Sequence, residues 1–266
     1  MTAPRSLLIL GCGNMGGAML AGWLAGGAAI AFTVVDPVVT EVPVGVRLLR
    51  AVPAEQFDVV LLGVKPQTLN EVAPALASVL NRETVLLSIL AGAELASLST
   101  RFPGAGAIVR VMPNLAAAIG KSPLGLYADQ LEPATRAQID TLLAPLGTPE
   151  WLASEAQLDA VTALAGSGPA FVYRFIAALS AGGAKLGLDP AQAERLARAT
   201  VEGAALLAAA SPATPDALAQ RVTSPGGTTA AGLAVLDDDA ALLRLVTATL
   251  RAARDRGAEL AAATRG

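Results

Sequence analysis

The chain contains no histidine and only one cysteine, and these absences exclude several kinds of catalytic and metal site. Without histidine there is no Ser-His-Asp triad, no histidine-ligated zinc and no histidine general acid. The single cysteine, Cys12, excludes an intramolecular disulfide and a cysteine-based metal cluster. Any chemistry must therefore depend on hydroxyls, carboxylates, lysine, backbone amides or a bound cofactor, and we expect no metal site.

Aromatic residues and net charge are also low. Aromatic residues make up 3% of the 266 residues and hydrophobic residues 53%, so the core must consist mainly of Ala, Leu and Val. So much apolar area favours a subunit interface. The formal net charge is −3 and no segment is strongly basic, which argues against a nucleic-acid partner.

The N-terminal stretch lacks charge, since residues 7–35 contain no ionisable side chain of Asp, Glu, Lys or Arg. Gly22 and Gly26 have the spacing of closely packed membrane helices. However, glycines and Asn14 interrupt the stretch and no basic cluster flanks it, which fits neither a membrane span nor a signal peptide. We therefore expect a soluble, cytoplasmic protein with no membrane partner.

Strand-like and helix-like segments alternate in the first half of the chain. Short apolar runs predict strands at residues 7–10, 32–35, 46–49, 59–64, 84–88, 107–111 and 124–127. Helices are predicted between them at residues 15–24, 66–80 and 133–143. Residues 37–45 are too short and too interrupted by proline for a full helix. This alternation predicts an α/β fold with a Rossmann-like, doubly wound and mostly parallel sheet over residues 1–153.

The pattern changes near residue 150, and from Ser154 onward no strand is evident. Helices are predicted at residues 158–186, 191–210, 216–221 and 239–263. Residues 170–188 are apolar on most faces apart from Arg174 and Lys185, and a helix of this kind must be surrounded by protein. An all-α domain over residues 154–266, too small to surround such a helix by itself, predicts a partner subunit.

A glycine-rich turn follows the first predicted strand and opens the first predicted helix. It consists of Gly11, Cys12, Gly13, Asn14, Met15 and Gly16, with the spacing G-x-G-x-x-G. Gly11 permits a tight turn, Gly13 lets the backbone approach a pyrophosphate, and Gly16 lets the helix pack near the strand. The helix N-terminus then offers N–H groups to phosphates. Asp36 ends the next strand, where a carboxylate would bind the adenosine ribose, so we predict a dinucleotide-binding oxidoreductase.

Four further segments are too unusual for ordinary loops. Residues 63–67 (Gly, Val, Lys, Pro, Gln) and 110–114 (Arg, Val, Met, Pro, Asn) end predicted strands, at the edge where such sheets bind ligands. Residues 165–170 interrupt the helical domain with two glycines. Residues 222–229 (Val, Thr, Ser, Pro, Gly, Gly, Thr, Thr), here called the hydroxyl loop, precede a helix and suit a small carboxylate. The alternatives are a simple capping loop and, for Lys65, a solvated surface lysine.

The turn and these four segments, taken in order, resemble the pyrroline-5-carboxylate reductase family over essentially the whole chain. The resemblance implies reduction of 1-pyrroline-5-carboxylate to L-proline with NADH or NADPH, the last step of proline biosynthesis. It also implies a homodimer that the helical domain forms by interlocking, and in some members a ring of dimers.

The resemblance implies site residues as well. For the cofactor, residues 11–16 would hold the pyrophosphate, and further residues would line the nicotinamide dinucleotide: Gly63, Val64, Lys65, Pro66, Leu90, Ala91 and Gly92. For the substrate, it implies a loop contributed by the other subunit, together with neighbouring residues: Ser224, Gly226, Gly227, Thr228, Thr229, Glu155 and residues 166–169.

Within this set we interpret Thr229 as the catalytic residue that hydrogen-bonds the ring nitrogen. The amides of Gly226, Gly227 and Thr228 would hold the substrate carboxylate. Many members have Ser and Tyr where this chain has Ala165 and Phe171, so neither hydroxyl can be essential here.

Cofactor preference and two other functions stay open. Asp36 should repel a 2′-phosphate and so favour NADH, although Arg50 would offset this repulsion. A reductase of another imine or a β-hydroxyacid dehydrogenase relative is one alternative, but the dehydrogenases need a catalytic lysine in the helical domain, where only Lys185 is present. A catalytically silent dinucleotide-binding protein is the other, and the intact hydroxyl loop argues against it.

Overall fold

The computed structural model describes residues 4–263, and these divide into two compact units. The first unit comprises residues 4–166 and 253–263, and the second comprises residues 167–252. The predicted domain boundary, between residues 153 and 154, lies earlier in the chain. The difference arises because Leu158, Ala163 and Ala165, which follow the last strand, are buried and pack against the sheet of the first unit.

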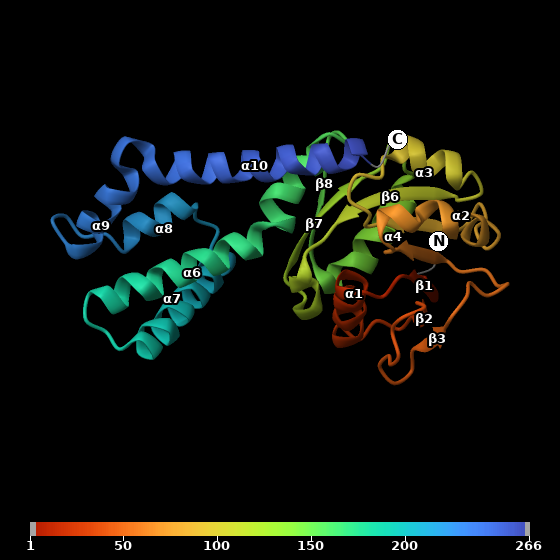
Figure 1. The fold of residues 1–266 in the computed structure, drawn as a ribbon, viewed down its shortest axis with the longest axis horizontal. Coiled ribbons are helices and arrows are strands. Elements are labelled where there is room, and N and C mark those ends of the chain that lie inside the picture. Colours follow the sequence, from red (N-terminus) through yellow and green to blue (C-terminus); the bar gives the residue numbers. More distant parts are fainter. Residues whose placement is uncertain (1–3, 264–266) are drawn as a thin grey trace. The chain divides into compact units, whose positions relative to one another are not determined.

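The first unit is built around an eight-stranded sheet (Figure 1). Its strands are β1 (Ser6–Leu10), β2 (Ala31–Val35), β3 (Arg47–Leu49), β4 (Val59–Leu62), β5 (Val85–Ser88), β6 (Ala107–Met112), β7 (Ser122–Tyr127) and β8 (Gly147–Trp151). Their order is β3-β2-β1-β4-β5-β6-β7-β8, and every neighbouring pair is parallel except β6 with β7. This confirms the predicted Rossmann-like sheet. The strand order reverses between β1 and β4, and open sheets of this type bind ligands at the carboxyl ends of the strands beside such a reversal.

Apolar side chains form a separate core on each face of the sheet. Along β1, Leu7 and Ile9 belong to one core, and Leu8 and Leu10 belong to the other. All four side chains are at most 4% exposed. A strand that is buried on both faces has no polar face, which is why the sequence shows a continuous apolar run instead of alternation.

Helices cover both cores of the first unit. They are α1 (Asn14–Ala25), α2 (Leu69–Ala77), α3 (Leu95–Arg101), α4 (Pro133–Leu143) and α5 (Gln157–Val161). Side chains of α1 and α4 belong to one core, and those of α2 and α3 belong to the other. Trp23 of α1 donates a 2.7 Å hydrogen bond from Nε1 to the carbonyl of Leu142 in α4, which fixes the two helices to each other.

Some elements of the first unit differ from the sequence-based prediction. β8 and α3 were not predicted, because β8 contains Pro149 and a mixed pattern, and α3 has only 7 residues. The helix predicted at residues 66–80 is a 3₁₀ turn, Pro66–Thr68, followed by the shorter α2. Residues 37–45 contain no helix, as expected.

All regular secondary structure in the described residues of the second unit is helical. It contains α6 (Gly168–Lys185), α7 (Pro190–Ala210), α8 (Pro215–Arg221), α9 (Thr228–Asp237) and the first part of α10 (Ala241–Ala263). The Asp189 carboxylate accepts the N–H of Gln192 at the start of α7, and the Thr214 hydroxyl accepts that of Ala217 in α8. Such caps satisfy N–H groups that have no partner within the helix.

Two predicted helices of the C-terminal half are interrupted or shortened. The helix predicted at residues 158–186 is broken by a π-helical turn, Thr162–Gly166, between α5 and α6. The last helix begins at Ala241 and not at Asp239, because Asp239 and Ala240 have positive φ angles of 46° and 52°.

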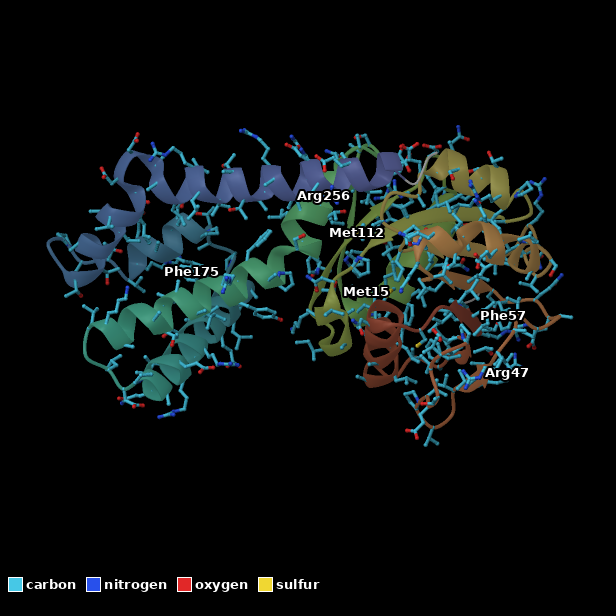
Figure 2. The ribbon with its side chains drawn as sticks, in the orientation of Figure 1. Met15, Arg47, Phe57, Met112, Phe175 and Arg256 are labelled. Atoms are coloured by element: carbon cyan, nitrogen blue, oxygen red, sulfur yellow. The ribbon has the colours of Figure 1, made fainter. Side chains whose placement is uncertain are left out.

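Large apolar side chains of the second unit are exposed. Phe175, labelled on α6 in Figure 2, is 47% exposed, and Leu207 and Leu243 are 72% and 67% exposed. The stretch Gln157–Lys185 is long and apolar enough to cross a membrane by length and composition alone, and 6% of an apolar 18-residue window within it is buried. A helix that a second subunit covers has the same properties.

Candidate functional site

The glycine-rich turn joins β1 to α1, and each of its glycines has a distinct geometric reason. Gly11 has a φ of +89°, and a Cβ there would lie 2.7 Å from the Gly63 carbonyl oxygen. A Cβ on Gly16 would lie 2.5 Å from the carbonyl oxygen of Gly11. Gly13 differs, since its Cβ would meet no heavy atom within 4 Å. Side chains are thus excluded at Gly11 and Gly16 by the protein itself, whereas the space beside Gly13 is open to a ligand.

The N-terminus of α1 suits an anion. Gly13 is the residue before the helix and provides no side-chain cap, and the first turn contains no acidic residue. The partial positive charge of the helix end is therefore not offset by a carboxylate in that turn. Together with the open space beside Gly13, this geometry fits the pyrophosphate of a dinucleotide.

Asp36 ties the turn to the chain that follows β2. Its Oδ2 accepts the N–H of Cys12 at 2.8 Å, and its Oδ1 accepts those of Val38 and Val39 at 2.8 and 3.0 Å. Burial alone would raise the pKa of Asp36, but hydrogen bonds from Val39, Val38 and Cys12 and the charge of Arg50 hold the pKa below its ordinary value of 3.8. Asp36 is therefore ionised at neutral pH.

Arg50 also forms hydrogen bonds to the chain that follows β2. Its Nη1 donates to the Asp36 carbonyl at 2.8 Å and to the Val39 carbonyl at 2.5 Å. These bonds hold the guanidinium beside the Asp36 backbone, at the end of the strand where an adenosine would lie. The sequence indicated Arg50 as an opposing charge but gave no sign of these contacts.

Cys12 lies in the turn with a half-buried thiol. Burial, and next the neighbouring Asp36 charge, raise the pKa of the Cys12 thiol above its ordinary value of 9.0. The thiol is therefore protonated at neutral pH and is a poor nucleophile.

The segments that follow β1, β4 and β5 lie at one edge of the sheet. Gly63 donates its N–H to the Leu10 carbonyl at 2.8 Å, and Ile89 donates to the Leu62 carbonyl at 3.1 Å. The residues predicted to line the cofactor after β4 and β5 therefore continue from strands that neighbour the glycine-rich turn. Lys65, in the segment that follows β4, is exposed.

Two other unusual segments meet through Asn114, which is 5% exposed. Its Nδ2 donates to the Ala165 carbonyl at 2.9 Å, and its Oδ1 accepts the N–H of Ala116 at 2.9 Å. Its own N–H donates to the Ser122 hydroxyl at 2.9 Å. Asn114 thus fixes the glycine-containing turn at residues 165–166 to the end of β6.

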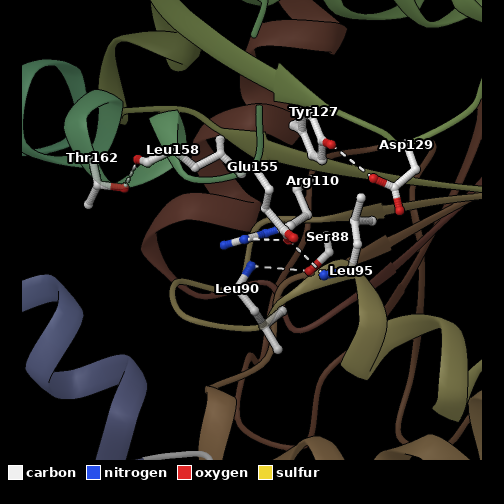
Figure 3. A network of polar contacts seen from close by, with 9 residues as sticks. All are labelled: Ser88, Leu90, Leu95, Arg110, Tyr127, Asp129, Glu155, Leu158 and Thr162. Atoms are coloured by element: carbon white, nitrogen blue, oxygen red, sulfur yellow. Dashed lines mark hydrogen bonds and ion pairs between the residues drawn. The ribbon is translucent and has the colours of Figure 1, made fainter. Parts of the chain in front are cut away.

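Glu155 and Arg110 form a contact that the sequence did not predict (Figure 3). Arg110 Nη1 lies 2.7 Å from Glu155 Oε1, and the same oxygen accepts the N–H of Leu95 at 2.7 Å. The only feature of the sequence that pointed to such a contact was the charge of Arg110 within the otherwise apolar β6. Glu155, expected near the substrate, is thus held among groups of the first unit.

The hydroxyl loop belongs to the second unit. Gly227 donates its N–H to the Ser224 carbonyl at 3.0 Å, and Gly226 has a φ of +68°. With Pro225 before Gly226, this is the arrangement of a type II turn. A Cβ on Gly227 would lie 2.3 Å from Ser224 Oγ, so a side chain there would displace the hydroxyl.

Helix α9 starts at this loop without a side-chain cap. Gly227 precedes the helix, Thr228 is its first residue, and Thr228 and Thr229 are exposed. An exposed helix N-terminus flanked by hydroxyls provides donors but no negative charge, which suits a small carboxylate.

A parallel sheet with a strand-order reversal, an open glycine-rich turn at that reversal and a separate helical unit define a Rossmann-like, dinucleotide-binding oxidoreductase. Residues 155–260 match the family described as pyrroline-5-carboxylate reductase dimerisation, and residues 6–92 match that described as NADP oxidoreductase coenzyme F420-dependent. The pyrroline-5-carboxylate reductase of Pseudomonas aeruginosa is 38% identical over 98% of this chain and 98% of its own. That of Methanosarcina acetivorans is 34% identical over 94% and 96%.

Solved structures agree. A pyrroline-5-carboxylate reductase from Coxiella burnetii has a TM-score of 0.86 at 29% identity, covering 96% of this chain and 97% of that chain. The Plasmodium falciparum pyrroline carboxylate reductase with NADP bound has a TM-score of 0.78 at 25% identity, covering 95% and 97%. The chain belongs to the pyrroline-5-carboxylate reductase family, which confirms the resemblance found in the sequence.

Proposed function

We propose that this chain reduces 1-pyrroline-5-carboxylate to L-proline with a reduced nicotinamide dinucleotide. The observation that carries the proposal is the hydroxyl loop at the uncapped start of α9, in a chain that also has an open dinucleotide turn. The first feature suits a small carboxylate and the second suits a pyrophosphate. Family membership supplies the reaction that requires both.

The cofactor would be held by the first unit. The backbone of the glycine-rich turn would bind the pyrophosphate, and the remaining contacts would come from Gly63, Val64, Lys65, Pro66, Leu90, Ala91 and Gly92. When bound, the reduced nicotinamide supplies a hydride to the imine carbon. The task of the chain is to hold this cofactor against the substrate, and orientation of two reactants supplies about 7–11 kcal/mol in favourable cases.

The substrate would be held by the hydroxyl loop. The amides of Gly226, Gly227 and Thr228 would bind the carboxylate, with the Ser224 hydroxyl beside them, and the Thr229 hydroxyl would hydrogen-bond the ring nitrogen. A cyclic imine is a moderately strong base, so much of it can bind as the iminium, which is already electrophilic. The chain therefore needs no strong acid, and this agrees with its lack of histidine.

We further propose that NADH is the preferred cofactor. The Asp36 carboxylate is ionised and lies where the adenosine ribose would be, so it repels a 2′-phosphate. Arg50 opposes this repulsion from the neighbouring strand end. The Michaelis constants of NADH and NADPH test the balance: a lower constant for NADH supports the dominance of Asp36, and a lower constant for NADPH contradicts it.

The chain forms an oligomer through its helical unit, and we propose a cytoplasmic homodimer that can assemble further into a ring of dimers. The exposed apolar side chains of α6, α7 and α10 support a close contact between subunits.

The proposed activity is tested by mixing the purified protein with racemic pyrroline-5-carboxylate and either reduced cofactor. Cofactor oxidation matched by proline formation is the expected result. Binding of the cofactor without turnover would support the silent dinucleotide-binding alternative. Oxidation with other cyclic imines, but not with pyrroline-5-carboxylate, would support a different imine reductase.

A further inference from the structure

The contact between Arg110 and Glu155 differs from the other ion pairs of the described residues. The Arg110 side chain is 7% exposed and that of Glu155 is 28% exposed, whereas both partners in each of the other pairs are more than 40% exposed. Removing charged groups from water is unfavourable unless their geometry is well matched. Such a pair adds little net stability, so its contribution lies in the groups that it holds in place.

Glu155 holds the start of α3. Its Oε1 accepts the N–H of Leu95, the first residue of that helix, at 2.7 Å. Glu94, which precedes the helix, does not cap it with its side chain. Leu95 is 4% exposed, so its N–H depends on a carboxylate 60 positions further along the chain.

The segment before Leu95 is the cofactor loop, defined here as residues 89–94. At its other end, Leu90 donates its N–H to Ser88 Oγ at 3.4 Å, and Ser88 is 1% exposed. Ser88 and Arg110 are paired residues of the neighbouring strands β5 and β6. One end of the loop is thus bonded to Ser88, and the other end is bonded through Glu155 to Arg110 (Figure 3). Both attachments therefore lead to adjacent positions of the sheet. Between them Gly92 has a φ of +77°, a conformation that needs glycine.

We propose that the Arg110–Glu155 pair is a positioning device for the cofactor loop. Arg110 orients the Glu155 carboxylate, and the carboxylate fixes Leu95 and with it the path of Leu90, Ala91 and Gly92. This inference rests on the proposed function, because that function assigns the loop to the cofactor. Glu155 then affects the reaction through the cofactor, and not by touching the substrate.

The test measures cofactor affinity in the absence of substrate, from the fluorescence of the reduced nicotinamide. Glu155→Ala removes the acceptor of Leu95, and we expect the dissociation constant of the cofactor to rise about tenfold. Glu155→Gln keeps an oxygen in the same place and should restore most of the affinity. Glu55→Gln, in the exposed pair with Arg47, is the matched control and should bind cofactor like the unaltered protein.

Two further readouts separate positioning from other roles. Hydrogen exchange of the free protein should be faster at the Leu95 amide in Glu155→Ala than in Glu155→Gln. The Michaelis constant for the pyrroline, at saturating cofactor, should change little in either variant. An increase in that constant with an unchanged cofactor dissociation constant would overturn the proposal, because it would indicate direct substrate contact.

Glu155→Ala leaves a buried guanidinium without its partner and so can impair folding. The double variant Arg110→Met, Glu155→Leu removes both charges and avoids this problem. Weak cofactor binding by the folded double variant supports the proposal, and affinity equal to that of the unaltered protein overturns it. If the unaltered protein binds cofactor but does not reduce the pyrroline, the proposed function fails while the effect of Glu155 on cofactor affinity can still be measured.

Discussion

At the scale of single residues, Asp36 has a structural role that its sequence position does not show. Its place at the end of β2 predicted a contact with the adenosine ribose. The structure adds three backbone N–H donors, one from the glycine-rich turn and two from the chain after β2. The carboxylate therefore stabilises the local fold even before a cofactor binds.

Asp36→Asn tests this structural role. The variant loses the charge-assisted hydrogen bonds, so we expect the free energy of unfolding at pH 7 to fall by about 2 kcal/mol. Because the pKa of Asp36 is lowered in the folded state, this stability is present above the ordinary value of 3.8 and is lost as the pH falls through the folded-state value. Urea unfolding from pH 7 downward should show a constant difference in the free energy of unfolding between the unaltered protein and the variant. This difference should narrow only below about pH 4. A difference that narrows already between pH 7 and 5 would count against Asp36 as its source.

Thr229 is the residue on which the proposed chemistry depends most. Thr229→Val keeps the shape of the side chain and removes its hydroxyl, so we expect kcat/KM for the pyrroline to fall by at least about tenfold. Thr229→Ser keeps the hydroxyl and should retain most of the activity. Steady-state kinetics with saturating cofactor give the comparison, and full activity in the valine variant would remove Thr229 from the mechanism.

The tight turn at Gly11 and the close packing at Gly16 could be predicted because they depend on a local pattern between a strand and a helix. The partners of Glu155 could not, because Arg110 and Leu95 lie 45 and 60 positions away. No spacing rule connects residues at such separations, and only the sheet order brings them together.

At the scale of elements, α1 packs unusually closely against the 3₁₀ turn Leu115–Ile119. A Cβ on Gly22 would lie 2.0 Å from the Ala117 carbonyl oxygen, and one on Gly26 would lie 2.7 Å from Pro145 Cβ. The spacing of these glycines, which in the sequence was also compatible with membrane helices, serves close packing within the first unit.

Gly22→Ala should therefore destabilise the protein, although alanine favours helices. Overpacking of this kind costs about 1–3 kcal/mol, which exceeds the gain of up to about 1 kcal/mol in helix propensity. Gly17→Ala in the same helix is the control, because its Cβ would meet only the Cys12 carbonyl oxygen, at an ordinary 3.8 Å. Thermal unfolding should give a lower midpoint for Gly22→Ala and no decrease for Gly17→Ala. Equal midpoints for the two variants would contradict the packing argument.

The elements that could be predicted are those with long or continuous apolar patterns, such as β1, β4 and α4. The π-helical turn at Thr162–Gly166 could not, because residues 158–186 are apolar enough for one uninterrupted helix. Its position follows from tertiary contacts: Asn114 binds the Ala165 carbonyl, and Ala163 and Ala165 are buried. Tertiary contacts, and not the local sequence, therefore determine where the helix is interrupted between α5 and α6.

At the scale of the whole molecule, the exposed apolar side chains of the second unit require a partner surface. Leu207→Lys combined with Leu243→Lys places two charges on this surface and should raise the dissociation constant of the oligomer by at least about tenfold. Sedimentation at micromolar concentration should show a smaller species. Val44→Lys, at a fully exposed position of the first unit, is the control and should leave the mass unchanged. An unchanged mass in the double variant would mean that these side chains lie outside the interface.

The central claim is that the chain transfers hydride from a reduced nicotinamide to the imine carbon of pyrroline-5-carboxylate. The most direct measurement uses a reduced cofactor with deuterium at the transferable position of C4, followed by mass spectrometry and NMR of the product. We predict L-proline that carries one deuterium on the former imine carbon, in an amount equal to the cofactor oxidised. Cofactor oxidation without labelled proline, or no oxidation at all by folded protein that binds the cofactor, would contradict the claim.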